Sequence, residues 1–537
     1  MTMNLSSLKN MKKACAVVLG LLAALAAGAQ TNLPNSVPLI VPSATNAPVT
    51  ITNALPSMTN VLEQSISLDQ VLQATLQNNY DIAIQRLNPQ IAAYDVSLGY
   101  AAFDPTFAAS ITHTYSKTAG GFNQTIETNV PGSTLKNNIV ASSLGGVLPF
   151  GTTYNFTENL TERYGMVAGH AVDSSSGSIG VNVTQPLLRN FWMNQNLLTI
   201  LVNKNRYKYS EQGLRLQVIT TITLAEQAYY DLIADRENVQ VQRAALELAD
   251  RLLAENKKRV EVGTMAPLDE KQAESQLESS RADLISAERA LTAQENVFKQ
   301  ALSGDYAKVH DISYIPVETL AAPVQVFDLQ SSWTKGMTMR PDLIQARLNL
   351  EQQGIQLKYD RNQLFPELDV FGSYGYGAGG PTTVEWGDAT GDLTSRNQPF
   401  YSYGASISVP LSNAKARATY KQTKLTVQQA LLTLKQLEQN VLVEIDDAIK
   451  QAQSDYQSVA ATRAAREYAE AALDAEQKKF QSGKSTSFIV LSLQKDLTTA
   501  RSAEITALAS YNKSLAALAQ QEGSTLERRG ITVKVER

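Results

Sequence analysis

The chain is organised by one long run, residues 411–482, which reads LSNAKARATYKQTKLTVQQALLTLKQLEQNVLVEIDDAIKQAQSDYQSVAATRAAREYAEAALDAEQKKFQS. This run contains neither Gly nor Pro. As an α-helix it would be about 108 Å long at 1.5 Å per residue, whereas an average globular helix has about 11–12 residues. The run therefore predicts a helix far longer than an ordinary globular fold needs.

One side of this helix carries apolar or small residues at steps of three, four or seven, with one step of fourteen. They are Leu434, Val441, Ile445, Ala448, Ala452, Val459, Leu473 and Phe480. A repeat of 3.5 residues indicates a helix that supercoils against neighbouring helices. The run ends at Ser482-Gly483-Lys484, where Gly can supply the left-handed residue that closes a helix. A return helix is expected to follow, up to about residue 522.

The same series of elements occurs earlier in the chain. A run from Leu187 to Val262 has one Gly and no Pro, and it ends at a first glycine turn, Val262-Gly263-Thr264. Alternating apolar and polar residues precede each long run, at 107–115, 154–160, 179–183, 368–376 and 401–409. Such alternation is typical of half-buried strands, and strands of roughly 9–11 residues suit a membrane barrel. The pattern predicts an internal tandem duplication.

The number of strands is left open between two alternatives. The first strand zone, from Pro105 to Pro186, is nearly twice as long as the second, from Pro366 to Pro410. The extra length could hold another hairpin with its turn at residues 148–151. Parity supports this hairpin, because a strand zone flanked by helices on one side of a membrane must cross it an even number of times. Four and six strands in each chain both stay open at this point.

Composition and the N-terminus restrict the class of protein further. The net charge of −4 implies no nucleic-acid partner. Lys12 and Lys13 followed by an apolar run predict a secretory signal peptide over residues 1–29, which would contain the single cysteine, Cys15. No residue pattern indicates a catalytic centre, a cofactor or a metal site, and we expect no enzyme activity.

Five segments carry a resemblance to a known family. They are VTQPLLRN (183–190), RVEVGTMAPLDEKQAE (259–274), RPDLIQARLNL (340–350), LFPELDVFGSYGY (364–376) and SVPLS (408–412). Together with the ordered duplication, the chain resembles the TolC-like outer-membrane efflux proteins. The resemblance implies a mixed α and β membrane protein and a homotrimer. Its antiparallel coiled-coil helices would form a periplasmic tunnel and its strands one shared β-barrel, of 12 strands or alternatively 18.

The resemblance also implies functional residues. The family's glycine turns dock a periplasmic adaptor protein, which places that role on Val262, Gly263 and Thr264 at one tip and on Ser482, Gly483 and Lys484 at the other. Asp269 fits the place of an acidic tunnel constriction. Its equivalent in the second half is Ile489, so a second acidic ring is not expected.

The sequence thus predicts an exit duct in the outer membrane, partnered by an adaptor, an inner-membrane transporter and outer-membrane lipid. A non-conducting coiled-coil scaffold of the cell envelope is the alternative, and the sequence names no substrate. The expected segments are a signal peptide (1–29), a flexible arm (30–64), a first repeat (65–304, strands about 105–185), a connector (305–339), a second repeat (340–523, strands about 367–409) and a C-terminal tail (524–537).

Overall fold

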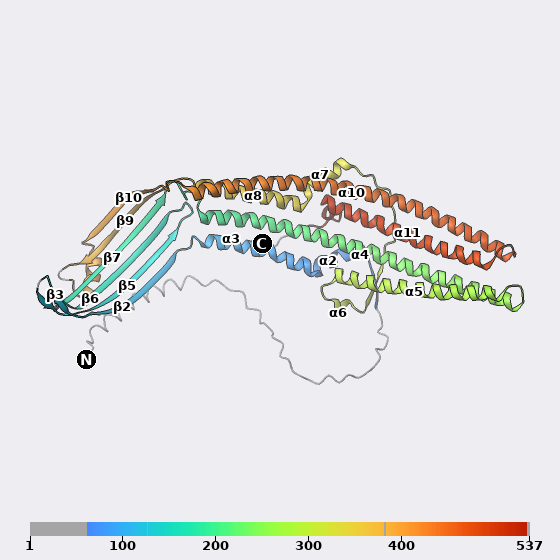
Figure 1. Cartoon of the computed structure of the whole chain (residues 1–537), viewed down its shortest axis with the longest axis horizontal. Helices are drawn as coiled ribbons and strands as arrows, with labels where there is room; N and C mark the ends of the chain where they lie inside the picture. Colours follow the sequence, from blue (N-terminus) through green and yellow to red (C-terminus); the bar gives the residue numbers. More distant parts are fainter. Residues whose placement is uncertain (1–61, 126, 381–382, 534–537) are drawn as a thin grey trace, which may run out of the picture. The chain divides into compact units, whose positions relative to one another are not determined.

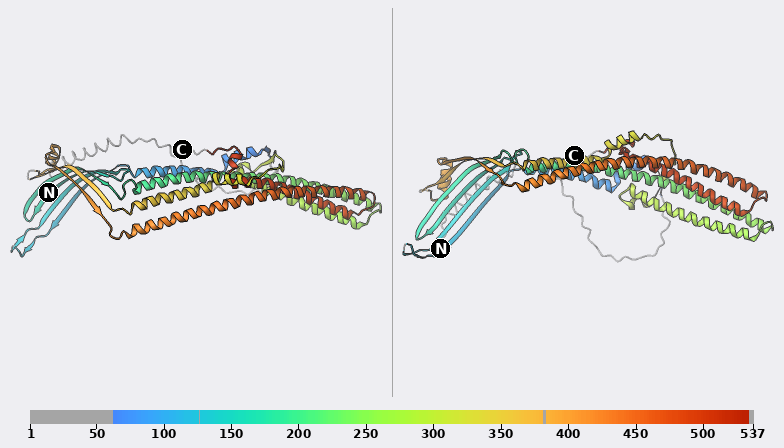
Figure 2. Two further views of the ribbon diagram at one scale, coloured as in Figure 1. Left: turned by 90° about the horizontal axis from the view of Figure 1, so that it is seen from above. Right: turned by 45° about the horizontal axis from the view of Figure 1, so that its top comes forward.

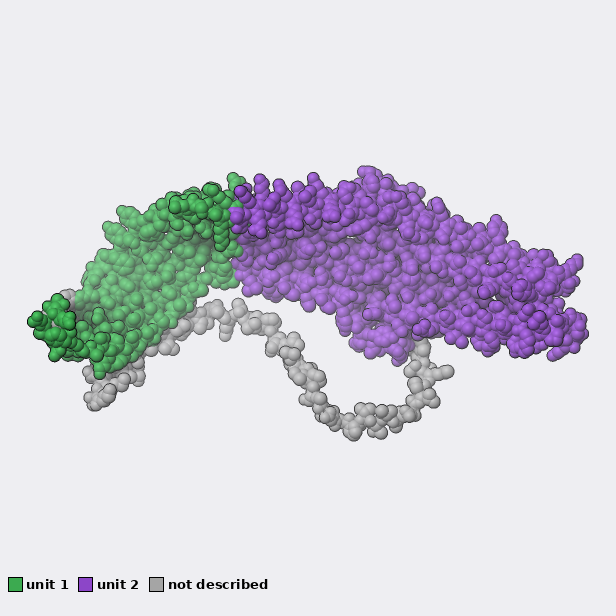
Figure 3. Space-filling view, in the orientation of Figure 1, with its two compact units in different colours: residues 1–55, 100–197, 359–417 green, residues 56–99, 198–358, 418–537 purple. Residues whose placement is uncertain are grey.

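A computed structural model describes residues 62–125, 127–380 and 383–533. The expected signal peptide and most of the expected arm lie outside these residues. The chain divides into two compact units, coloured separately in Figure 3. Among the described residues, unit 1 holds 100–197 and 359–417, and unit 2 holds the remainder.

Unit 1 is built on one antiparallel sheet of six strands in the order β10-β9-β7-β6-β5-β2, which lie side by side in Figure 1. The strands are β2 (Thr106–Thr118), β5 (Ser133–Val147), β6 (Thr153–Val167), β7 (His170–Pro186), β9 (Glu367–Gly379) and β10 (Pro399–Ser408). A small hairpin, β3 (Gly121–Asn123) and β4 (Thr128–Val130), extends the connection between β2 and β5. The favoured expectation of four strands is wrong, because β5 and β6 form the additional hairpin around residues 148–152.

The register gives this sheet two chemically different faces. Residues on the face that we call the apolar face include Phe107, Ile111, Leu144, Phe156, Leu160, Ile179, Val181, Tyr374, Tyr401 and Ile407. The opposite face, which we call the polar face, includes Ser110, Thr112, Ser143, Thr157, Asn159, Asn182, Ser373, Ser402 and Ser406. Glu158 and Gln185 on the apolar face and Ile139 and Phe371 on the polar face are exceptions. The pattern is otherwise the period-2 alternation of a sheet with apolar surroundings on one side and water on the other.

The two edges of the sheet have no strand partner within the described residues. Strand β2 pairs only with β5, and β10 pairs only with β9. An edge strand of 10 or 13 residues exposes a row of backbone N–H and C=O groups that can pair with another chain.

The helices repeat in two series of nearly equal lengths. The first is α2 (Leu68–Asn78), α3 (Tyr80–Ala101), α4 (Gln195–Glu261) and α5 (Pro267–Leu302), and the second is α7 (Leu329–Met339), α8 (Pro341–Asn362), α10 (Ala414–Gln481) and α11 (Ser487–Glu522). Paired lengths are 11 and 11, 22 and 22, 67 and 68, and 36 and 36 residues. In Figures 1 and 2, α5 runs back along α4 and α11 runs back along α10.

Short elements connect the two series. Strands β1 (Leu62–Ile66) and β8 (Ile312–Pro316) pair in parallel, so residues 62–64 are strand and not part of an arm. The expected connector contains α6 (Tyr306–Val309), β8 and α7, and α7 opens the second helix series ahead of the expected start at 340. Gly336 of α7 packs closely on Ile445, because a Cβ there would lie 2.4 Å from Ile445 Cδ1 and that side chain would have to shift.

The main core of unit 2 joins segments from both ends of the chain. Its largest fully buried side chains include Tyr229, Phe298, Ile82, Leu214 and Leu232. The C-terminal segment packs on this core through Leu526, Ile531 and Val533, and it forms the short helix α12 (Thr525–Arg528). The expected C-terminal tail is therefore docked over its described part.

Within the described part of the chain, no helix combines the length and the apolar character that crossing a membrane requires.

Candidate functional site

The two glycine turns at the ends of the long hairpins have the same backbone geometry. Gly263 has φ +73°, and its N–H donates to Val260 O at 3.0 Å while Thr264 N–H donates to Arg259 O at 2.9 Å. Gly483 has φ +74°, with equivalent bonds to Phe480 O at 3.1 Å and from Lys484 N–H to Lys479 O at 2.9 Å. Both turns are Schellman motifs, which satisfy the last carbonyls of a helix through a left-handed residue.

Glycine is required at both tips by backbone conformation and not by crowding. A Cβ added at Gly263 or Gly483 would meet nothing within 4 Å. Both turns therefore have open space around them in the single chain. All six of the residues that the sequence singled out at the tips, 262–264 and 482–484, are exposed.

Four apolar side chains are exposed next to these turns. Val262 is 72% exposed, Leu268 67%, Phe488 64% and Ile489 43%. The first two belong to the first hairpin and the other two begin the return helix of the second. Sequence reasoning missed Leu268 and Phe488, although each follows closely after a glycine turn. Apolar groups gathered at the end of a hairpin are typical of a surface that contacts another molecule.

Contacts between the two hairpins hold the tips together. Arg259 places its guanidinium 4.4 Å from the centre of the Phe480 ring, and Phe480 is buried in a cluster with Leu252, Leu473, Val490, Leu491 and Leu497. Arg259 also pairs with Glu255 at 2.5 Å. Nothing in the sequence pattern indicated the contact of Arg259 with Phe480, because the two partners lie in different halves of the duplication.

Asp269 makes one of these contacts. It lies in the first turn of α5, and its Oδ1 accepts a hydrogen bond of 3.1 Å from Ser487 Oγ, which is buried. The side chain therefore links the start of α5 to the start of α11. A role in a tunnel constriction stays a prediction.

The second tip also has an anchored carboxylate. Glu476 accepts hydrogen bonds from Lys479 Nζ at 2.8 Å and from Ser485 Oγ at 2.5 Å. These bonds, that from Lys479 first, lower the pKa of Glu476 below its usual range. The carboxylate thus fastens the turn residue Ser485 to the last turns of α10.

An apolar stripe on α3 forms a second candidate contact surface. Tyr80, Ile84, Leu87, Ile91, Tyr94 and Leu98 follow one another at alternating steps of four and three, and each is at least half exposed. This spacing is that of a coiled-coil seam, which normally faces a partner helix. Helix α10 likewise exposes Leu425, Leu432 and Val443. The sequence reading of the long runs did not include the α3 stripe.

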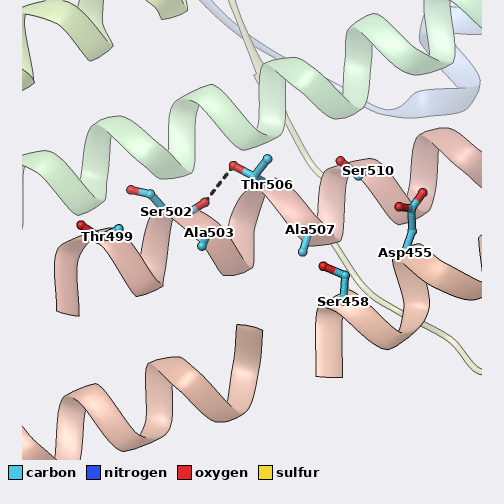
Figure 4. A pocket seen from close by; sticks show the side chains of 8 residues that line it. All are labelled: Asp455, Ser458, Thr499, Ser502, Ala503, Thr506, Ala507 and Ser510. Atoms are coloured by element: carbon cyan, nitrogen blue, oxygen red, sulfur yellow. Dashed lines mark hydrogen bonds between the residues drawn. The ribbon is translucent and has the colours of Figure 1, made fainter. Parts of the chain in front are cut away.

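A hollow between α10 and α11 is lined mainly by small side chains. It measures about 460 Å³ and is lined by Asp455, Ser458, Thr499, Ser502, Ala503, Thr506, Ala507 and Ser510, shown in Figure 4. Small side chains leave the space, and Thr506 Oγ1 bonds back to its own helix at Ser502 O. Across the described residues, no group of three His, Cys, Asp or Glu side chains could hold a metal ion.

Long paired helices joined to an amphipathic antiparallel sheet define the fold of the outer-membrane channels. The crystal structure of the Campylobacter jejuni CmeC outer membrane channel matches with a TM-score of 0.61 at 17% identity, over 90% of this chain and 94% of that one. The outer membrane protein VceC of Vibrio cholerae matches with a TM-score of 0.61 at 16% identity, over 85% and 96%.

The family follows from the sequence comparison. The family model described as outer membrane efflux protein matches residues 149–304 and 337–524, more than half of the chain. The chain belongs to the outer membrane efflux protein family, which confirms the resemblance.

Two curated relatives match part of this chain in sequence. They are the outer membrane protein TolC of Vibrio cholerae, 24% identical over 41% of this chain, and the pyoverdine export outer membrane protein OpmQ of Pseudomonas aeruginosa, 26% identical over 56%. The chain spans about half the length of these relatives, 49% of TolC and 60% of OpmQ.

Proposed function

We propose that three copies of this chain form an exit duct that crosses the outer membrane. Each copy would contribute six strands to one barrel of 18, and its helices to a tunnel in the periplasm. The observation that carries the proposal is the open six-stranded sheet with one polar and one apolar face. In lipid, unpaired strand edges are too costly to persist, so the sheets of neighbouring copies must close on one another.

The arrangement of strands suits such closure. All five pairings within the sheet are antiparallel, and six is an even number, so β10 of one copy would meet β2 of the next in antiparallel orientation. Barrels of 16–18 strands leave an aqueous channel. The Ser, Thr and Asn side chains of the polar face would line it.

Helix surfaces support association of the same copies. The exposed stripe on α3 and the exposed leucines of α10 are apolar faces that a single chain leaves without a partner. Packing helices of adjacent copies would bury them, at about 25 cal/mol for each Å² of apolar surface removed from water. The amphipathic sheet favours the duct over a coiled-coil scaffold, which would need no strands of this kind.

Conductance of the purified protein in a planar lipid bilayer tests the duct. We expect discrete ohmic current steps in KCl, because a barrel of this width would hold water. A protein that assembles and inserts but gives no current would favour the scaffold instead.

The tips would dock a periplasmic adaptor that connects the duct to an inner-membrane transporter. Exposed Val262 and Phe488 are the apolar groups best placed for that contact. Removing one such group from an interface typically weakens it by roughly 1–3 kcal/mol, so removing both should weaken binding about 30-fold or more, since each 1.4 kcal/mol is tenfold.

The docking proposal predicts that Val262→Asp with Phe488→Asp abolishes transport without affecting assembly. Growth of a strain lacking its own copy, challenged with antibiotics, dyes and metal salts, would measure this. Ile285→Asp, an exposed apolar position on α5 away from the tips, is the matched control and should leave resistance unchanged. Full resistance in the double variant would contradict docking at these residues.

A further inference from the structure

The short helix α9 (Trp386–Ser395) lies on the apolar face of the six-stranded sheet. Its Ala389 is fully buried against Leu160 of β6 and Ala378 of β9, and Trp386 and Leu393 pack on the same cluster. The register places Leu160, Gly177 and Ala378 in one row across neighbouring strands, with Val140 beside Leu160. The helix therefore covers one defined row of the face that would otherwise meet lipid.

Close contact fixes α9 in this position. A Cβ at Gly177 would lie 2.7 Å from Leu160 Cδ2 and 3.0 Å from Leu393 Cδ1, so the absence of a side chain at Gly177 lets these two leucines pack closely over the sheet. Ser175 N–H donates to Thr383 O at 2.9 Å, and Thr383 Oγ1 donates to Asp392 Oδ2 at 3.0 Å. These bonds attach the start of the helix to β7.

The outward side of α9 is polar. Its exposed positions are Gly387, Asp388, Thr390, Gly391, Thr394 and Ser395, none of which has an apolar side chain larger than a hydrogen atom. The hydroxyls of Thr390, Thr394 and Ser395 bond to carbonyls of their own helix. The exposed carboxylate of Asp388 is nevertheless costly to place in hydrocarbon, so this surface suits water or lipid headgroups better.

The rows of the apolar face on the two sides of α9 differ in polarity. Toward the sheet end that continues into the long helices, the next row is mixed. It carries Ile179 and Tyr376 but also Glu158, which accepts a hydrogen bond of 3.0 Å from Ser142 Oγ. The row after it, with Phe156, Val181 and Tyr374, is apolar. In the opposite direction, the next row is polar. There His113 Nδ1 lies 2.6 Å from Asn138 Oδ1, and Asn138 Nδ2 donates to Glu162 Oε2 at 2.7 Å.

The geometry points to α9 as an interfacial helix that lies at the headgroup level of the outer leaflet and marks the edge of the hydrocarbon. This inference rests on the proposed position of the sheet in the outer membrane. The hydrocarbon boundary would fall on the row of Ile179 and Tyr376. From there to the row of Leu368 is about 20 Å along the membrane normal, at 3.3 Å per residue and a tilt near 40°. An apolar band of a membrane barrel is about 25 Å tall, so the dimensions agree.

Single-cysteine labelling in a Cys15→Ala background tests the inference. The three variants are Thr394→Cys on the outward side of α9, Val181→Cys in the apolar band, and Asn182→Cys, its neighbour on the polar face. Protein in vesicles is treated with a water-soluble maleimide, and a fluorophore at each site is then quenched by lipids brominated near the ends of their acyl chains. We expect at least tenfold faster maleimide labelling at 394 and 182 than at 181, and quenching at 181 alone.

Each outcome decides one proposal. If Thr394→Cys is shielded from maleimide and quenched like Val181→Cys, α9 is immersed in hydrocarbon and the inference is overturned. If Val181→Cys labels as fast as Asn182→Cys and is not quenched, the sheet does not lie in the membrane and the proposed function itself fails. All three positions are exposed in the single chain, so the cysteines should leave its fold intact.

Discussion

Replacing Glu226 with Gln is expected to release the C-terminal segment from the helical unit. Glu226 is fully buried in α4, and its two oxygens accept from Arg528 Nη2 at 2.9 Å and Arg529 Nε at 2.6 Å. Neutralising one member of a buried ion-pair cluster costs about 3–5 kcal/mol, since it leaves the partner charges uncompensated. Both arginines keep some exposure to water, so we expect the lower end, about 3 kcal/mol.

Hydrogen exchange of the backbone amides of residues 525–533, followed by mass spectrometry, measures this opening directly. A loss of about 3 kcal/mol corresponds to roughly 100-fold faster exchange, because each 1.4 kcal/mol is tenfold. Glu247→Gln, which breaks the exposed pair with Arg251, is the matched control and should change exchange less than about fivefold.

A second variant separates loss of charge balance from loss of packing. Replacing Glu226, Arg528 and Arg529 together with Met removes all three charges and keeps their bulk. Exchange should then stay within about tenfold of the unmodified protein, because well-packed apolar groups can substitute for a buried ion cluster. Unchanged exchange in Glu226→Gln would show that Leu526, Ile531 and Val533 alone hold the segment.

Local patterns in the sequence predicted much of this fold. The long run without Gly or Pro corresponds to α10, and the run with a single Gly corresponds to α4. The glycines at 263 and 483 adopt the left-handed conformation that a closed helix end needs. Alternating residues located five of the six strands of the sheet. These signals are readable because each depends only on residues close together in the chain.

The elements and contacts that the sequence did not predict depend on residues far apart in the chain. Strand β1 forms by pairing with β8, which belongs to the connector far along the chain. Helix α9 contains two glycines and few strong helix formers. It is stabilised by capping bonds that the N–H groups of residues 384 and 385 donate to Asp388 Oδ2, and by burial of Ala389 against the sheet. Strand β5 has less regular alternation. The strand count was underestimated because the 12 strands usual in the family that the chain resembles were favoured over the extra hairpin. The inter-hairpin contacts of Arg259 and Asp269 likewise join the first half of the duplication to the second.

The central claim is that edge strand β10 of one copy pairs with edge strand β2 of the next. Within one copy these strands lie at opposite edges of a six-stranded sheet, about 24 Å apart at 4.8 Å for each of five spacings. Two cysteines can form a disulfide only when their Cα atoms are within about 7 Å. A disulfide between β2 and β10 must therefore join two copies.

Disulfide formation between these edges in membranes tests the claim most directly. Ser406→Cys is combined in turn with Ala108→Cys, Ser110→Cys or Thr112→Cys in the Cys15→Ala background, so that alternative registers on the polar face are sampled. Ser406→Cys with Ser143→Cys on the inner strand β5 is the control that should not cross-link. The account predicts that at least one edge pair gives covalent species ending at a trimer on a denaturing gel. A ladder ending at a dimer would limit the barrel to 12 strands, and monomer alone for every edge pair would contradict closure by neighbouring copies.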